Sequence, residues 1–97
     1  MRIPTPSPLR EAPPAQAFRL RSGEEARSLV QLASALSRAS PGDVEFHKAH
    51  FPAWLRGVLG DEPLARRFEH YAAAGGDADV LRATLAALAR RRAEELG

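Results

Sequence analysis

The sequence predicts an all-α fold: a compact bundle of four main helices plus one short helix, preceded by a flexible proline-rich tail. Apolar residues recur at steps of three and four, and so fall on one helix face, in four stretches that begin near Ala26, Phe51, Leu64 and Val80. Residues that end one helix and cap the next stand between these stretches. We therefore expect two parts, a disordered tail over residues 1–16 and a helical domain over residues 17–97.

The tail carries five of the eight prolines, and beyond Met1 its large apolar side chains are Ile3 and Leu9. Burial of so few apolar groups cannot offset the entropy lost on ordering, so we expect a flexible segment, with docking on a partner as the alternative. After the tail, Phe18 and Leu20 alternate with arginines. This alternation predicts a short extended piece that faces the bundle and is not part of a sheet.

The first long helix is expected from Ser22 to about Ala39. Ser22 and Glu25 have the spacing of a capping box, in which each side chain accepts the backbone N–H of the other residue. Pro41 disfavours helical geometry at Ser40 and ends this helix. The apolar face of the helix is predicted to comprise Ala26, Leu29, Val30, Ala33 and Leu36.

A short helix over residues 44–48 is expected next, capped by Ser40 or Asp43. The following helix is expected to start near Pro52, where a missing N–H costs no hydrogen bond, and to end at Gly60. Its apolar face is predicted to comprise Phe51, Trp54, Leu55, Val58 and Leu59.

Two more helices complete the bundle. Asp61 is expected to cap the first of them, which closes at residues 74–76, and its buried face is predicted to comprise Leu64, Ala65, Phe68 and Ala72. Asp77 or Asp79 is expected to cap the last helix, with the arginines at 90–92 near its negative end. The apolar face of the last helix is predicted to comprise Val80, Leu81, Leu85, Leu88 and Leu96.

Composition excludes several kinds of protein. The 97-residue chain has no cysteine, which excludes disulfides, thiolate metal sites and a cysteine nucleophile. Its net charge is only +2, which is not typical of a nucleic-acid-binding protein. No apolar run approaches the ~18 residues of a membrane span or has the form of a secretory signal, so we expect a cytoplasmic protein that does not contact a membrane.

From Phe18 onward the chain carries an ordered series of motifs. They are GEEARSL over residues 23–29, Phe46-His47, FPAWLRGVLGDEPLA over residues 51–65, and an amphipathic stretch at residues 80–88. This series resembles a family of small prokaryotic all-helical domains of unknown function, whose most specific motif is F-x-x-W-[ILV]-x-x-V-L-G-D-E-x-L-A. The link between His47 and Phe51 is much shorter here than in the family pattern. The resemblance implies a helical fold and no particular activity.

Polar, aromatic and charged side chains are expected to converge around a candidate binding surface of His47, His50, Trp54, Arg56 and Asp61. The two histidines share a helix face if the short helix continues through both. We interpret them as structural residues that hydrogen-bond backbone groups at the helix junction, with His50 capping the next helix. Trp54 is expected in the core, and an exposed ion pair is expected between Arg56 and Asp61.

A metal site at His47 and His50 is one alternative. It would need a third ligand, which Glu45 or Asp61 could supply, but the spacing secures only the two histidines, so no metal and no cofactor is predicted.

DNA binding is a weaker alternative. A helix-turn-helix around residues 60–61 would use Arg66 and Arg67 as phosphate contacts, but Glu62 and Glu69 share that helix and would repel the phosphates. The arginines at 90–92 are interpreted as a helix-end feature, with contact to an acidic partner as the alternative.

No catalytic residue is predicted, because no serine lies in a nucleophile elbow and no phosphate-binding loop is present. By elimination we expect a non-enzymatic protein-interaction or accessory module with a protein partner. Its contact surface would combine the region around His47, His50 and Trp54 with the tail. Homo-oligomerisation stays open as an alternative.

Overall fold

A computed structural model describes residues 10–96 of the chain. A 3-10 turn (Pro14–Gln16) precedes two short strands, β1 (Phe18–Arg19) and β2 (Glu25–Ala26). The helices that follow are α1 (Leu29–Arg38), α2 (Pro41–His47), α3 (His50–Gly57), α4 (Glu62–Ala74) and α5 (Ala78–Leu96). The prediction of a mostly helical, compact protein is confirmed, and the pair of strands is an addition to it.

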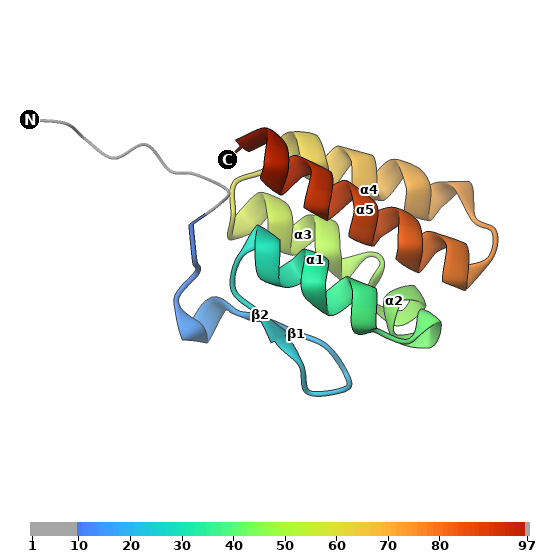
Figure 1. The fold of residues 1–97 in the computed structure, drawn as a ribbon, viewed down its shortest axis with the longest axis horizontal. Helices are drawn as coiled ribbons and strands as arrows, with labels where there is room; N and C mark the ends of the chain where they lie inside the picture. Colours follow the sequence, from blue (N-terminus) through green and yellow to red (C-terminus); the bar gives the residue numbers. More distant parts are fainter. Residues whose placement is uncertain (1–9, 97) are drawn as a thin grey trace, which may run out of the picture.

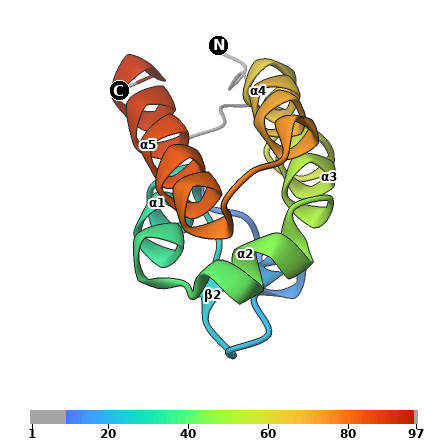
Figure 2. The same ribbon diagram turned by 90° about the vertical axis from the view of Figure 1, so that its right-hand side faces the viewer.

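The helices form two antiparallel pairs along one direction, α1 with α5 and α3 with α4 (Figure 1). Viewed end-on, one pair lies on each side of the molecule, and α2 lies across one end (Figure 2). The pairs are joined where α4 packs on α5 and where α2 packs on α5. Among residues 10–96, no helix is both long and apolar enough to cross a membrane.

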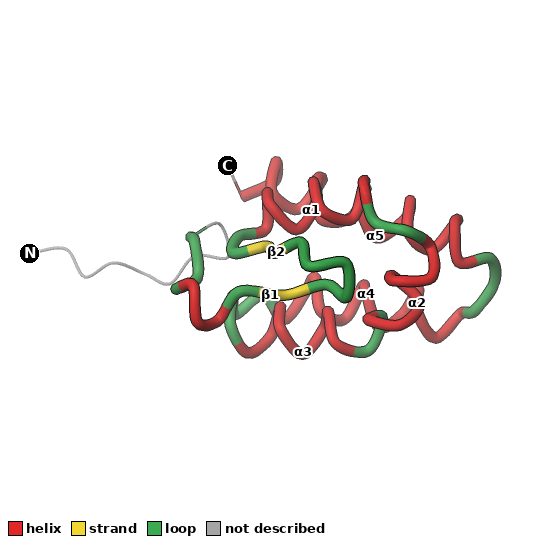
Figure 3. Tube along the Cα trace, turned by 90° about the horizontal axis from the view of Figure 1, so that it is seen from below, coloured by secondary structure: helices red, strands yellow, loops and turns green. Residues whose placement is uncertain are grey.

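Residues 18–26 form a β-hairpin instead of the predicted first turns of a helix. Phe18 pairs with Ala26, and the Leu20 N–H donates to the Glu24 carbonyl at 2.9 Å. Gly23 has φ +98°, a left-handed conformation that glycine adopts without strain. The hairpin lies below the bundle, with β2 near α1 and β1 near α3 (Figure 3). Phe18 faces the bundle as predicted, but it does so from a strand of a sheet.

The predicted capping box at Ser22 is wrong, because α1 begins six residues later. Ser28 has an extended backbone, and its hydroxyl accepts the Gln31 N–H at 3.1 Å. The Gln31 side chain accepts the Arg27 N–H at 2.8 Å. Ser-x-x-Gln at residues 28–31 therefore caps the helix, while Ser-x-x-Glu at residues 22–25 occupies the hairpin turn.

The caps of α2 and α4 are as predicted. Ser40 caps α2 by accepting the Asp43 N–H at 3.1 Å, and Asp61 caps α4 by accepting the Leu64 N–H at 3.3 Å. After α3, the chain reverses at Gly60, whose φ is +70°. The α3 helix begins two residues before Pro52, and His50 is its first residue with no side-chain cap, so the prediction that His50 caps this helix is wrong.

The chain from residue 10 packs against the hairpin and α3, which corrects the predicted tail over residues 1–16. Ala12 is buried, and its N–H donates to the Arg27 carbonyl at 2.6 Å. The Gln16 carbonyl accepts the indole N–H of Trp54 at 2.7 Å. Backbone hydrogen bonds hold this segment, and composition could not indicate them. Residues 1–9 of the predicted tail lie outside the described residues.

Aromatic rings form the centre of the core. Phe51 is fully buried and stacks on Phe18 with ring centroids 4.8 Å apart, and it meets the edge of Phe68 at 6.1 Å. The same buried cluster contains leucines from α1, α3, α4 and α5. Two predicted core residues face solvent instead: Val30 is 59% exposed and Val80 is 63% exposed. Val30 lies about 100° around the helix from Leu29, and it is Leu29 that points inward.

Replacement of Phe51 by alanine should lower the free energy of unfolding by about 3–5 kcal/mol, because it removes a ring that is enclosed on all sides. Val80→Ala should change it by less than about 0.5 kcal/mol, because that side chain is exposed. Urea denaturation followed by circular dichroism measures both variants. Equal effects of the two substitutions would contradict this assignment of the core.

Candidate functional site

The five residues of the predicted surface lie in three separate places. His47 and His50 meet where α2 joins α3, and Arg56 lies on the exposed side of α3. Trp54 and Asp61 are buried. The sequence therefore predicted the meeting of the two histidines correctly, and the structure does not bring the other three residues to their surface.

The His47 ring is held from both sides. It is buried, and its Nε2 accepts the backbone N–H of Arg21 at 3.0 Å, which ties the hairpin turn to α2. Its Nδ1 lies 3.2 Å from Nδ1 of the exposed His50. The expected hydrogen bond between a histidine and a backbone group is therefore present, but the backbone group belongs to the hairpin.

These contacts assign the proton positions in both rings. Since Nε2 of neutral His47 accepts a hydrogen bond, the proton must be on its Nδ1, which then donates to Nδ1 of His50. Neutral His50 consequently carries its proton on Nε2. No side chain or backbone group of residues 10–96 accepts a hydrogen bond from this Nε2.

Phe46 lies beside the histidines and is 52% exposed. Its ring meets the edges of His47 and His50, with centroids 4.8 and 5.8 Å away, and the Arg21 guanidinium lies 4.3 Å from its centroid. Arg21 is itself fixed by two hydrogen bonds to Asp43, at 2.8 and 3.0 Å. We call Arg21, Phe46, His47 and His50 the aromatic–histidine surface.

Burial lowers the pKa of His47 below its ordinary value of 6.5, and the nearby His50 and Arg21 lower it further while Asp43 opposes them. Protonation of His47 would also turn Nε2 into a donor that faces the Arg21 N–H. The folded protein therefore resists this protonation more than the unfolded chain does.

Stability should consequently decrease as the pH falls through about 6.5, because below that value the unfolded chain binds a proton at residue 47 that the folded protein binds only at lower pH. Above about 6.5 this group should contribute no slope. Thermal unfolding between about pH 7.5 and 5.5, above the range of ordinary carboxylates, measures the effect. His47→Gln keeps an acceptor for the Arg21 N–H and should flatten the dependence.

His70→Gln provides the matched control, since His70 is exposed on α4 and should leave the slope unchanged. Equal slopes for wild type and His47→Gln would contradict the role assigned to His47.

Trp54 is a core residue, as predicted. It is 8% exposed and meets the edge of Phe18 with ring centroids 5.8 Å apart. The partner that its indole N–H required is the Gln16 carbonyl. Trp54 thus attaches the N-terminal segment to α3 and is not available as a binding platform.

Asp61 is the most deeply buried charged residue among those described, with no exposed surface. One carboxylate oxygen caps α4, and the other accepts a hydrogen bond from Arg92 Nε at 3.0 Å. The expected pair of Arg56 with Asp61 is wrong, because the partner of Asp61 comes from α5. This carboxylate therefore fixes both the start of α4 and the rotation of α5.

Asp61→Ala should lower the free energy of unfolding by about 3–5 kcal/mol, because it removes a helix cap and leaves Arg92 without its partner. Asp61→Asn keeps the capping oxygen and should cost less. As a control, Asp79→Ala removes an exposed ion pair with Arg82 and should cost less than about 1 kcal/mol. Chemical denaturation of the three variants tests this order, and a cost for Asp61→Ala as small as that of Asp79→Ala would refute it.

Arg56 bridges two glutamates of α4. It donates to Glu62, and to Glu69 at 3.0 and 3.3 Å, while Arg66 donates to Glu62 at 3.0 Å. The hydrogen bonds from Arg56 lower the pKa of both carboxyls, and those carboxylates in turn raise the pKa of Arg56. The acidic side chains of α4 are thus directed toward α3, where they form ion pairs with Arg56.

The alternative of a metal site gains no support from the geometry. A histidine that binds a metal through one nitrogen usually donates a proton from the other, but Nε2 of His47 faces a donor, so its Nδ1 must keep its proton. Within the described part of the chain, no three His, Cys, Asp or Glu side chains come together closely enough to hold a metal ion.

The arrangement of α3 and α4 also differs from a helix-turn-helix. The two helices lie side by side as an antiparallel pair (Figures 1 and 2), whereas helices of that motif cross at about 90–120°. The predicted use of α4 as a DNA-recognition helix therefore has no geometric support.

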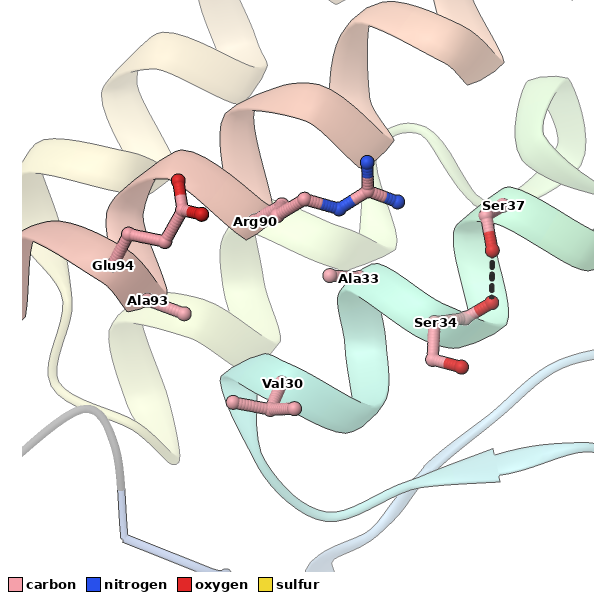
Figure 4. Close-up of a pocket in the computed structure, with 7 residues that line it drawn as sticks. All are labelled: Val30, Ala33, Ser34, Ser37, Arg90, Ala93 and Glu94. Atoms are coloured by element: carbon pink, nitrogen blue, oxygen red, sulfur yellow. Dashed lines mark hydrogen bonds between the residues drawn. The ribbon is translucent and has the colours of Figure 1, made fainter. Parts of the chain in front are cut away.

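A hollow between α1 and α5 has a floor of small side chains (Figure 4). Val30 lies at one end, and Ser37 donates its hydroxyl to the Ser34 carbonyl at the other, at 2.7 Å. Arg90 and Glu94 of α5 lie over it, so its rim has one charge of each sign. The rim charges therefore give no preference for an anionic or a cationic ligand.

Comparison of the chain with protein-family models, curated proteins and solved structures gives no significant match. The resemblance drawn from the motif series thus stays a prediction.

Sequence analysis missed Arg21 and Phe46 as members of the site. Phe46 precedes a predicted site histidine, and an aromatic residue on a short helix beside two histidines is a usable indication. Arg21 reaches Phe46 only because residues 18–26 form a hairpin, and without that hairpin nothing in the sequence links them.

Proposed function

We propose that this protein is a non-enzymatic interaction module, accessory to a larger protein or complex, and that it contacts its partner through the aromatic–histidine surface. The observation that carries the proposal is the half-exposed ring of Phe46, which is fixed between Arg21 and two histidine rings. An exposed large aromatic side chain held in one position is typical of the residues that contribute most to binding.

The rigidity of the surface supports this function. Arg21 is held by Asp43, and His47 is held by the Arg21 backbone, so the groups around Phe46 lose little conformational freedom when a partner covers them. Less entropy lost on binding leaves more of the contact energy as affinity.

The chemistry of the surface defines the partner in outline. Phe46 requires an apolar recess, and the Nε2–H of His50 requires an acceptor such as a backbone carbonyl. The guanidinium of Arg21 is about half exposed beside the ring and favours carbonyl or carboxylate groups at the rim. We therefore expect a protein surface with an apolar recess bordered by acceptors.

Photo-crosslinking in the native cells tests the proposal. A photoreactive amino acid at position 46 should give a defined adduct with one protein, while the same group at the still more exposed Val80 should not. Once the partner is purified, Phe46→Ala should weaken binding by about 30-fold or more, which corresponds to about 2 kcal/mol. Adducts that are the same from both positions, or an affinity unchanged by Phe46→Ala, would overturn the proposal.

A further inference from the structure

A second groove lies between α4 and α5, and none of its lining residues belongs to the aromatic–histidine surface. Its volume is about 490 Å³. The side chains that line it are Arg66, Arg67, His70 and Tyr71 of α4 and Leu88, Arg91 and Glu95 of α5. We call it the α4–α5 groove.

The α4–α5 groove is positively charged. Three arginines and one glutamate line it, which gives a local charge of +2 with His70 neutral (three minus one). Arg67 lies 3.7 Å from Glu95, and Arg66 pairs with Glu62 outside the groove. No carboxylate of residues 10–96 lies within ion-pairing distance of Arg91. Arg91 can therefore take a carboxylate from a partner without breaking an ion pair of its own.

Apolar surface lies among these charges. Tyr71 is 41% exposed, with its ring against the edge of His70, and Leu88 is partly buried on the opposite helix. A small inorganic anion would leave this surface uncovered. The groove thus matches an occupant that presents carboxylates and an apolar side chain together.

The orientation of the neighbouring acids removes an objection to an acidic occupant. Glu62 and Glu69 share α4 with Arg66 and Arg67. Both are engaged by Arg56 on the α3 side, Glu62 also accepts a hydrogen bond from Arg66, and neither lines the groove. One helix therefore presents its acids to α3 and its bases to the α4–α5 groove.

We infer that the α4–α5 groove binds an acidic amphipathic helical segment of a partner protein, with a carboxylate on Arg91 and an apolar side chain over Tyr71 and Leu88. The side-by-side packing of α4 and α5 provides the kind of groove in which a third helix can lie. This inference goes beyond the proposed function, because it concerns a different face and does not require Phe46.

A nucleic acid fits the groove less well. A phosphate backbone is long and uniformly charged, and it is bound by a basic face that extends over several phosphates. The net charge of the whole chain is only +2, which is low for a protein that binds such a backbone. A helical segment with a few carboxylates can be bound by the positive charge of the groove alone.

Selection from a displayed library of random peptides of about 16 residues on the intact protein tests the inference. The selected peptides should combine acidic residues with apolar residues at helical spacing. Fluorescence anisotropy with a synthesised peptide should then show that Arg91→Ala and Tyr71→Ala each weaken binding by about tenfold or more. Replacement of the Glu and Asp residues of the peptide by Gln and Asn should weaken binding to the wild-type protein by a similar factor.

Arg90→Ala is the matched control. It removes the same charge one residue away, but Arg90 lies over the α1–α5 hollow, so this variant should retain wild-type affinity. Equal losses for Arg90→Ala and Arg91→Ala, or selection of peptides without acidic residues, would overturn the inference. Tighter binding of single-stranded DNA of about 16 nucleotides than of the peptide would also overturn it.

Two further measurements show whether a variant loses peptide binding because it unfolds, and whether the groove binds independently of the aromatic–histidine surface. Thermal unfolding by circular dichroism should give wild-type transitions for Arg91→Ala and Tyr71→Ala, because both side chains are exposed, so lost affinity would reflect lost contacts. Phe46→Ala should bind the peptide as wild type does. Loss of peptide binding in Phe46→Ala would contradict the independence of the two faces, and loss of peptide binding in Arg91→Ala alone supports it.

Discussion

The buried carboxylate of Asp61 is the constraint on which the arrangement of α4 and α5 depends. It caps α4 at one oxygen and holds Arg92 at the other, so the position of α4 and the rotation of α5 are set by the same group. A charge with no exposed surface is costly unless it is fully paired, and this requirement leaves α5 little freedom to rotate. The small apolar core alone would specify that rotation less strictly.

The three consecutive arginines of α5 show the effect of this constraint. Arg92 points inward to Asp61, Arg91 lines the α4–α5 groove, and Arg90 lies over the hollow beside α1. Successive residues of a helix differ by about 100°, so a run of identical side chains is divided among three environments. In the sequence they read as one basic cluster, whereas in the fold one of them is structural and two belong to different surfaces.

The sequence predicted the starts of α4 and α5 well, because their caps act over a few residues: Asp61 accepts the Leu64 N–H, and Asp77 accepts the Asp79 N–H at 2.7 Å. It failed before α1, where two Ser-x-x-Glu/Gln patterns compete and the choice depends on the pairing of Phe18 with Ala26. For the candidate site, spacing predicted that the histidines meet. It could not predict the Arg92 partner of Asp61, which is 31 positions away, or the contact of Arg21 with Phe46.

The hydrogen bond from the Arg21 backbone to His47 has a consequence for discrimination between partners. This bond places the proton of neutral His47 on Nδ1, which donates to His50, and so leaves the outer nitrogen of neutral His50 as a hydrogen-bond donor. A competing protein could place a lysine or an amide N–H opposite this nitrogen. Two hydrogen-bond donors would then meet without an acceptor, and burying them would reduce the binding free energy by about 1–3 kcal/mol. The hairpin backbone, which need not touch the partner protein, thereby disfavours partner surfaces that present a hydrogen-bond donor to His50.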